Sequence, residues 1–110
     1  KRLPFAQAAS GAIGIETLLP LALEMHHNES LPLKKIIETL TINPAKILKI
    51  NKGTLKQGSD ADMCVFNLDK PWVIKADLLK SKSKNTAVEE RKVQGKVLMT
   101  FLNGELAFKS

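Results

Sequence analysis

The glycine-rich segment near the N-terminus has the strongest potential for binding chemistry in this sequence. Gly11-Ala12-Ile13-Gly14 comes directly before a segment with helical periodicity. Glycines at such a position let backbone N–H groups face an anion, and the N-terminus of a helix favours negative charge. One interpretation of this turn is therefore the binding of a substrate carboxylate by backbone groups. The alternative is that the glycines only supply the backbone freedom that a loop needs.

His26 and His27, the two histidines of the sequence, are adjacent near the end of the same segment. Neighbouring residues on a helix point about 100° apart, so the two imidazoles cannot bind one metal ion from a regular helix. The C-terminus of a helix favours positive charge, which suits histidine at this place. We therefore expect the pair to stabilise a helix end and not to ligate a metal.

Asp60, Asp62 and Cys64 are also chemically reactive, but structural roles are expected for all three. The two carboxylates have the spacing of an acid–base or metal-binding pair, yet Gly58-Ser59-Asp60 is typical of a turn. Cys64 lies in an apolar run without a histidine or basic residue nearby, which predicts a buried, unreactive thiol. A single cysteine excludes an internal disulfide and a multi-cysteine zinc site, and it is compatible with a reducing cytoplasm.

The composition is that of a globular domain, with 110 residues of which 44% are hydrophobic and 25% charged. No apolar run approaches the roughly 18 residues of a membrane span, so no membrane partner is expected. The net charge is +6, yet all but two of the 17 basic residues are lysine, and tyrosine is absent. Base recognition favours arginine and single strands stack on aromatic rings, so nucleic acid is not expected as a partner.

The elements that must position these residues change character near Gly53. Before it, apolar residues recur with the spacing of helices, which are predicted at about 15–27, 32–40 and 43–50. Glu16 is expected in the first turn of the first helix, where negative charge is favourable. The expected N-caps of the second and third helices are Ser30 and Asn43, and Gly53 is expected to end the last helix.

After Gly53 the pattern predicts strands separated by turns. The apolar run within 61–67 suits a strand that is covered on both faces. Asn103-Gly104, between predicted strands at 96–102 and 105–108, is the strongest short signal for a β-hairpin. A further short strand is predicted at 72–74 and a solvated lysine-rich loop at 80–84. Apolar helices without a preceding strand to pack on indicate the end of a larger fold.

Five motifs follow one another along the chain: L-P-F-A at 3–6, G-x-x-G-x-E-T-x-x-P at 11–20, L-T-I-N-P-A at 40–45, G-x-L-x-x-G-x-x-A-D at 53–62 and S-K-N-T at 83–86. With these motifs in this order, nearly the whole chain resembles the dihydroorotases. The motif at 53–62 alone indicates only the wider amidohydrolase superfamily, and the motifs at 11–20 and 83–86 make the resemblance more specific.

The resemblance implies an α/β fold and a C-terminal fragment. Residues 1–52 would hold the terminal helices of a (β/α)8 amidohydrolase barrel with a substrate-side loop, and residues 53–110 the C-terminal half of a small β-sandwich-like domain. The implied activity is the reversible hydrolysis of dihydroorotate to N-carbamoyl-L-aspartate in de novo pyrimidine biosynthesis, with a zinc-activated hydroxide as nucleophile. Ser10 and Gly11 occupy the positions at which relatives contact the substrate ring.

The same resemblance places the zinc ligands and the catalytic aspartate upstream of Lys1, so this segment alone is expected to be inactive. The expected partners are the N-terminal barrel portion and the small-molecule substrate, with aspartate transcarbamoylase and a second copy of the chain as further candidates. The expected location is cytoplasmic. After S-K-N-T the chain has Ala87 and Val88 where the family usually has proline and an aromatic residue.

Three alternatives stay open at this point. The chain could belong to an inactive dihydroorotase-like scaffold subunit for aspartate transcarbamoylase, or to a related cyclic amidohydrolase such as an allantoinase. It could also be a free-standing basic binding module. A fragment predicts that the apolar helical faces are incompletely covered by the 110 residues, whereas a free-standing module predicts full coverage. The residues concerned are Leu18, Leu19, Leu23, Ile36 and Ile37.

Overall fold

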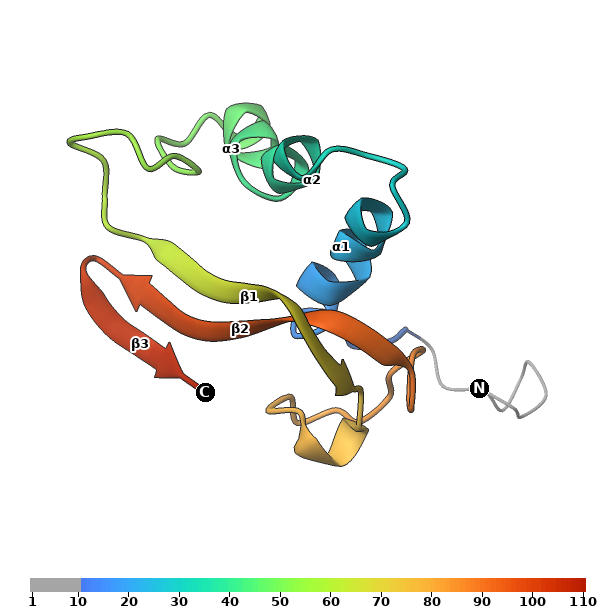
Figure 1. Cartoon of the computed structure of the whole chain (residues 1–110). Coiled ribbons are helices and arrows are strands. Elements are labelled where there is room, and N and C mark those ends of the chain that lie inside the picture. The colour runs from blue at the N-terminus through green and yellow to red at the C-terminus, as the bar shows by residue number, and fades with distance from the viewer. Residues whose placement is uncertain (1–10) are drawn as a thin grey trace.

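The computed structural model describes residues 11–110, in which helices come first and strands follow (Figure 1). The helices are α1 (Leu18–His27), α2 (Leu33–Leu40) and α3 (Ile42–Leu48). The strands are β1 (Met63–Val73), β2 (Lys92–Leu102) and β3 (Glu105–Lys109), with a short 3-10 helix over Ala76–Leu78 between β1 and β2. The predicted change from helices to strands is confirmed. Within this described range, no helix has the length and apolar character needed to cross a membrane.

The second and third helices begin away from their predicted caps. α2 begins after an extended Pro32, so Ser30 is not its N-cap. The Ser30 N–H donates instead to Oδ1 of Asn28 at 3.0 Å, within the turn between α1 and α2. Asn43 lies inside the first turn of α3, because Thr41 joins α2 directly to α3 and leaves no room for a separate cap.

The three strands form one antiparallel sheet in the order β1-β2-β3. The predicted hairpin is confirmed: Asn103-Gly104 joins β2 to β3 with φ values of 52° and 79°, which asparagine and glycine tolerate. The strands predicted at 61–67 and 72–74 are parts of the single strand β1, whose pairing with β2 is interrupted after Asn67. Oδ1 of Asn67 accepts the Asp69 N–H at 3.0 Å, so a local turn replaces ladder bonds there.

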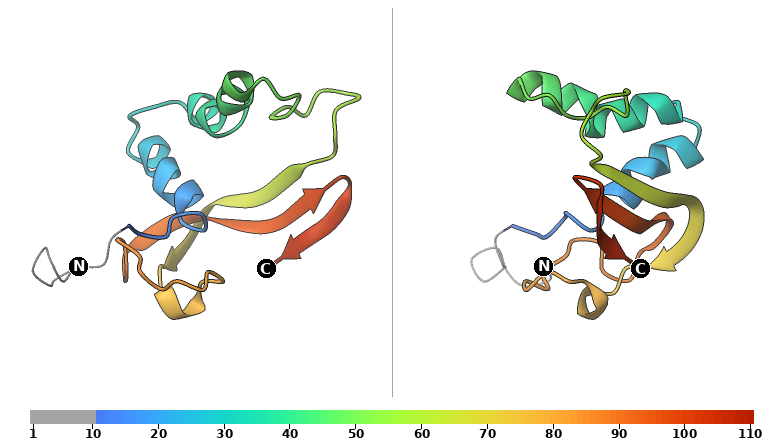
Figure 2. Two further views of the ribbon diagram at one scale, coloured as in Figure 1. Left: turned by 180° about the vertical axis from the view of Figure 1, so that it is seen from behind. Right: turned by 90° about the vertical axis from the view of Figure 1, so that its left-hand side faces the viewer.

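The prediction that the apolar run of β1 is covered on both faces is wrong for the described chain. Met63, Cys64 and Val65 are all exposed. α1 packs on β2, while α2 and α3 lie beyond α1 and away from the sheet (Figure 2). An apolar run indicates that a strand is suited to burial, but it does not say which segment covers the strand.

A small core joins α1 to the sheet. Its buried members are Ile74, Leu79 and Val93, against which Ile13, Leu21, Trp72 and Val88 pack. Leu23 of α1 is fully buried over Gly95 of β2, where a Cβ would lie only 2.6 Å from the leucine Cδ1. The Trp72 indole N–H donates to the Gly95 carbonyl at 2.8 Å. The helical part and the strand part of the described chain therefore share one packing interface.

The expectation of incompletely covered helical faces is confirmed only in part. Leu23 and Ile36 are buried within the described chain, whereas Leu18 is 54% exposed. On α3, Ile47 and Leu48 are 80% and 68% exposed. Burying a side chain of this size contributes about 1.5–3 kcal/mol, so these side chains would gain stability from further covering protein.

The contact of Gly53 with the α2–α3 junction yields a test of the fold. Gly53 has a φ of +80°, and a Cβ there would lie 2.7 Å from the Thr41 carbonyl oxygen. Gly53→Ala is expected to lower the free energy of unfolding by about 2–4 kcal/mol, because left-handed strain adds to a clash that backbone atoms cannot relieve. Gly58→Ala is the matched control, with a φ of +89° and nothing within 4 Å, and should cost about 1–2 kcal/mol. Equal losses in urea unfolding would contradict the steric role of Thr41.

Candidate functional site

The glycine turn, residues 11–14, lies beside a loop that follows it by some 70 residues in the sequence. Ile13 forms a parallel β-bridge with Thr86, and the Ile13 N–H donates to the Asn85 carbonyl at 2.9 Å. The Asn85 side-chain amide donates to the Gly11 carbonyl at 2.7 Å. Gly11 has a φ of +73°, which glycine adopts at little cost. Residues 80–86, here called the clamp loop, thus hold one side of the glycine turn.

Glu16 makes a second link between the same two segments. Its Oε1 accepts the Lys80 N–H at 3.0 Å and its Oε2 accepts the Ser81 N–H at 3.1 Å. A carboxylate that accepts two consecutive backbone N–H groups forms charge-assisted hydrogen bonds, which are stronger than neutral ones. The prediction that Glu16 lies in the first turn of α1 is wrong, because that helix begins at Leu18. Its carboxylate is used in a tertiary contact instead.

The clamp loop also binds within itself. The Lys84 ammonium donates to the Leu79 carbonyl at 2.7 Å, and the Asn85 N–H donates to Oγ of Ser83 at 3.3 Å. Leu79 is buried in the small core, so this lysine bond ties the loop to a fixed point. The three lysines of the loop are exposed, as predicted, but its backbone is positioned by specific partners.

The structure describes only one of the two residues that are predicted to contact substrate. Ser10 lies outside the described residues, and Gly11 is the first residue inside them. Gly11 is exposed, and its carbonyl oxygen accepts a hydrogen bond from the Asn85 side-chain amide. No contact within the described chain tests the binding of a substrate, so the role of both residues stays a prediction.

An open cavity of about 1190 Å³ lies next to the glycine turn. Its lining includes Ile15 and Leu78, which are 94% and 80% exposed, together with Trp72 of β1 and Phe108 of β3. Small-molecule pockets are usually about 300–1,000 Å³ and have buried walls. The size of this cavity and its exposed apolar walls indicate that further polypeptide would cover part of it, beside the groups of the glycine turn.

The histidine pair connects α1 to β1. Nε2 of His27 lies 3.1 Å from the Leu68 carbonyl, and Nδ1 lies 3.9 Å from a carboxylate oxygen of Asp69. The His26 and His27 rings are 5.2 Å apart between centroids and inclined at 58°. Both histidines lie in the last turn of α1, where positive charge is favourable. Their placement is that of a structural pair at a helix end.

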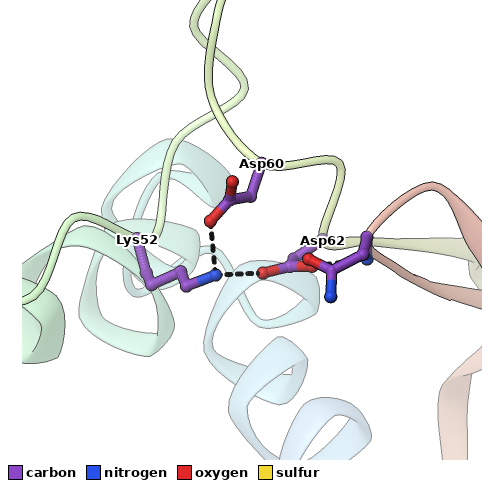
Figure 3. A network of polar contacts seen from close by, with 4 residues as sticks. Lys52, Asp60 and Asp62 are labelled. Carbon is purple, nitrogen blue, oxygen red and sulfur yellow. Dashed lines mark hydrogen bonds and ion pairs between the residues drawn. The ribbon is translucent and has the colours of Figure 1, made fainter.

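Asp60 and Asp62 converge on one lysine (Figure 3). Nζ of Lys52 lies 2.6 Å from Oδ2 of Asp60 and 2.7 Å from Oδ2 of Asp62, while Oδ1 of Asp62 accepts the Asn103 N–H at 2.8 Å. Hydrogen bonds from Lys52 and from the Asn103 backbone hold the pKa of Asp62 below its ordinary value. Hydrogen bonds to Asp60 and Asp62 raise the pKa of Lys52. The cluster connects the segment after α3 to the hairpin, in agreement with the structural role predicted for these carboxylates.

Cys64 is exposed, so its predicted burial is wrong. It lies in the uncovered part of β1, where its neighbours Met63 and Val65 are also exposed. Partial burial of the side chain nevertheless raises the pKa of the thiol above its ordinary value. A nucleophilic cysteine needs a lowered pKa and a nearby positive charge, and the raised pKa agrees with the predicted unreactive thiol.

The described residues do not fit a catalytic metal site. Among residues 11–110, no group of three or more histidine, cysteine, aspartate or glutamate side chains could hold a metal ion. Asp60 and Asp62 bind Lys52, and His27 contacts β1. The glycine turn itself consists of glycine, alanine and isoleucine, so the polar groups that it presents are those of its backbone.

Comparison with known proteins relates nearly the whole chain to one family. Residues 6–107 match the amidohydrolase family. The dihydroorotase of Ehrlichia chaffeensis is 43% identical over 110 residues, which are all of this chain and 25% of that protein. The dihydroorotase of Aquifex aeolicus is 42% identical over 102 residues, 93% of this chain and 24% of that protein. The chain therefore spans about a quarter of the length of the curated relatives it matches.

Solved structures share the fold of the chain. An L-hydantoinase (dihydropyrimidinase) from Arthrobacter aurescens superimposes with a TM-score of 0.83 at 32% identity, over 93% of this chain and 23% of that one. A D-hydantoinase superimposes with a TM-score of 0.85 at 25% identity, also over 93% and 23% of the two chains. The arrangement of helices and a small antiparallel sheet is thus found within larger hydrolases.

The Glu16 link predicts a local change in hydrogen exchange. Glu16→Gln replaces one of the two acceptor oxygens by an NH2 group and removes the charge, so the Lys80 and Ser81 amides should exchange roughly three- to tenfold faster. Glu105→Gln, on the exposed hairpin, is the matched control and should leave these two amides unchanged. Unaltered exchange at residues 80 and 81 in Glu16→Gln would show that the carboxylate does not hold the clamp loop.

The Lys52 cluster predicts a pH-dependent stability difference. Because the pKa of Asp62 is lower in the folded state, its contribution is present above the unfolded value near 3.9 and is lost as the pH falls through the folded value. The raised pKa of Lys52 means that its contribution is complete below its unfolded value near 10.4 and is lost only as the pH rises through the still higher folded value. Lys52→Met should therefore lower the melting temperature at pH 7, and the difference should shrink as the pH falls below about 4.

Lys56→Met is the control for this titration, because Lys56 belongs to the same segment and its side chain does not take part in the cluster. Its melting temperature should follow that of the unmodified protein at every pH. A Lys52→Met difference of constant size from pH 7 to pH 2 would disprove the electrostatic account of the cluster.

Proposed function

The chain belongs to the amidohydrolase family, and from this membership we propose that it forms the C-terminal part of a dihydroorotase. The reaction would be the reversible addition of water across the ring amide of dihydroorotate, which breaks the C–N bond and forms N-carbamoyl-L-aspartate. The observation that carries the proposal is the identity of about 40% to dihydroorotases over all or nearly all of the chain. The two most specific motifs also lie in contact, through the bonds of Asn85 with Gly11 and Ile13, and this contact supports the proposal.

In this proposal, residues 1–52 complete the wall of a (β/α)8 barrel and residues 53–110 form the C-terminal half of a small β-sandwich-like domain. The exposed apolar residues of α3 and the open cavity beside the glycine turn support contact with further protein. The partner proposed for these surfaces is the N-terminal barrel portion of the same enzyme. Ser10 and Gly11 would contact the substrate through backbone groups from the edge of that barrel.

The family is generally metal-dependent, and we propose zinc as the metal of the whole enzyme. Since residues 11–110 do not form a metal site, its ligands would lie in the remainder of the protein, and this segment alone would be inactive. A cytoplasmic enzyme is consistent with the single cysteine of the chain. Association with aspartate transcarbamoylase or with a second copy of the chain is part of the same proposal and follows from the resemblance alone.

A related cyclic amidohydrolase is the second candidate. The superposition with hydantoinases at TM-scores of 0.83 and 0.85 favours it, because these enzymes share the arrangement of the described elements. The two candidates differ in the substrate, which carries a ring carboxylate in dihydroorotate and lacks it in hydantoin. Backbone N–H groups of the glycine turn that favour an anion would bind this carboxylate, so they would favour dihydroorotate over hydantoin as the substrate.

The test uses the full-length protein that contains this chain. Dihydroorotate should be converted to N-carbamoyl-L-aspartate, detected by chromatography, and treatment with a chelator should reduce the rate at least a hundredfold until zinc is restored. The isolated 110-residue chain should show no turnover. Preferential hydrolysis of hydantoin would favour the second candidate, and binding of aspartate transcarbamoylase without turnover of either compound would identify the scaffold alternative.

A further inference from the structure

We propose that Asn85 is a positioning residue, which orients the peptide between Gly11 and Ala12 so that the Ala12 N–H faces the ligand of the glycine turn. This inference rests on the proposed function, because that function supplies the ligand. It concerns a residue of the clamp loop that lies 74 positions away from Gly11 in the sequence.

The Asn85 side chain fixes the direction of the Gly11 carbonyl. The Asn85 side-chain amide donates to this oxygen at 2.7 Å, a short distance for an N–H donor. A trans peptide is planar, so its N–H points opposite to its C=O. The Ala12 N–H therefore points away from Asn85, and Ala12 is among the residues that line the open cavity.

Two other polar groups of the glycine turn, the Ile13 N–H and the Gly14 carbonyl, also form hydrogen bonds within the chain. The Ile13 N–H donates to the Asn85 carbonyl at 2.9 Å, so this donor is already used within the chain. The Gly14 carbonyl accepts from the backbone and the hydroxyl of Thr17, at 3.2 and 3.3 Å, where α1 begins. Asn85 thus contacts the turn through both its backbone and its side chain, and only the side-chain contact acts on the Gly11–Ala12 peptide.

The backbone on which the Asn85 side chain stands is supported by the core. Ile13 packs against the core of Ile74, Leu79 and Val93, and Thr86 bridges to Ile13. The Asn85 backbone is therefore held by Ile13, which donates to its carbonyl and also pairs with the next residue, Thr86. A side chain on such a support can restrain a glycine, which otherwise has more backbone freedom than any other residue.

The experiment uses the full-length protein with Asn85→Ala and Asn85→Asp. Both variants keep the backbone bond from Ile13, and both remove the donor to Gly11. If the Ala12 N–H binds substrate equally in the ground and transition states, the KM for dihydroorotate should rise about three- to tenfold while kcat stays within about twofold. The metal content and the pH profile of kcat should not change, because Asn85 acts only on this peptide.

Lys82→Met is the matched control, since Lys82 is an exposed residue of the clamp loop and takes no part in the contacts of Asn85 with Gly11 and Ile13. Its KM should equal that of the unmodified enzyme. An unchanged KM in both Asn85 variants, or an equal increase in Lys82→Met, would overturn the positioning role.

A second measurement separates this inference from the proposed function. If the unmodified protein does not act on dihydroorotate, the proposed function fails, and hydrogen exchange at Ala12 then decides the orientation by Asn85. Exchange at this amide should change roughly threefold or more in Asn85→Ala and remain unchanged in Lys82→Met. Equal exchange in Asn85→Ala and the unmodified protein would disprove the orienting contact whatever the substrate is.

Discussion

The pairing of the glycine turn with the clamp loop is the interaction on which the other features of the structure depend. It joins the helical part to the strand part through the Glu16 carboxylate, the Asn85 amide and a backbone bridge at Ile13. Because Glu16 comes just before α1 and Ile13 packs in the core, the same contacts set where α1 begins relative to the sheet. The proposed substrate-binding backbone is thereby built by both halves of the chain.

The described chain leaves much apolar surface uncovered. Its buried core is small, while Ile47 and Leu48 of α3, Leu55 and the first residues of β1 remain exposed. Exposed apolar side chains near one another favour contact with further protein, because their burial removes apolar area from water. The relatives, of which this chain matches about a quarter, supply a reason for such surfaces: in a longer enzyme these faces would be interior.

The contribution of this segment to a cyclic amidohydrolase would be positional. Asp60 and Asp62 are engaged by Lys52, the histidines lie at a helix end, and the pKa of the Cys64 thiol is raised, so each reactive side chain has a structural explanation. What remains available near the glycine turn is the backbone. Backbone N–H groups held by a rigid support would bind a substrate without a proton transfer of their own, and in the proposed function the bond-breaking chemistry would then fall to other parts of the protein.

The sequence by itself determined the features that depend on local chemistry: the helices before Gly53, the strands after it, the Asn103-Gly104 hairpin and the family. These follow from spacing, backbone preference and motifs that neighbouring residues define. Only the tertiary structure decided that Cys64 is exposed, that Glu16 leaves the helix and binds the Lys80 and Ser81 amides, and that Asn85 reaches Gly11. The reason is physical: these hydrogen bonds join residues more than 60 positions apart, and burial depends on which segment covers a strand, and no local pattern records which distant segment will arrive.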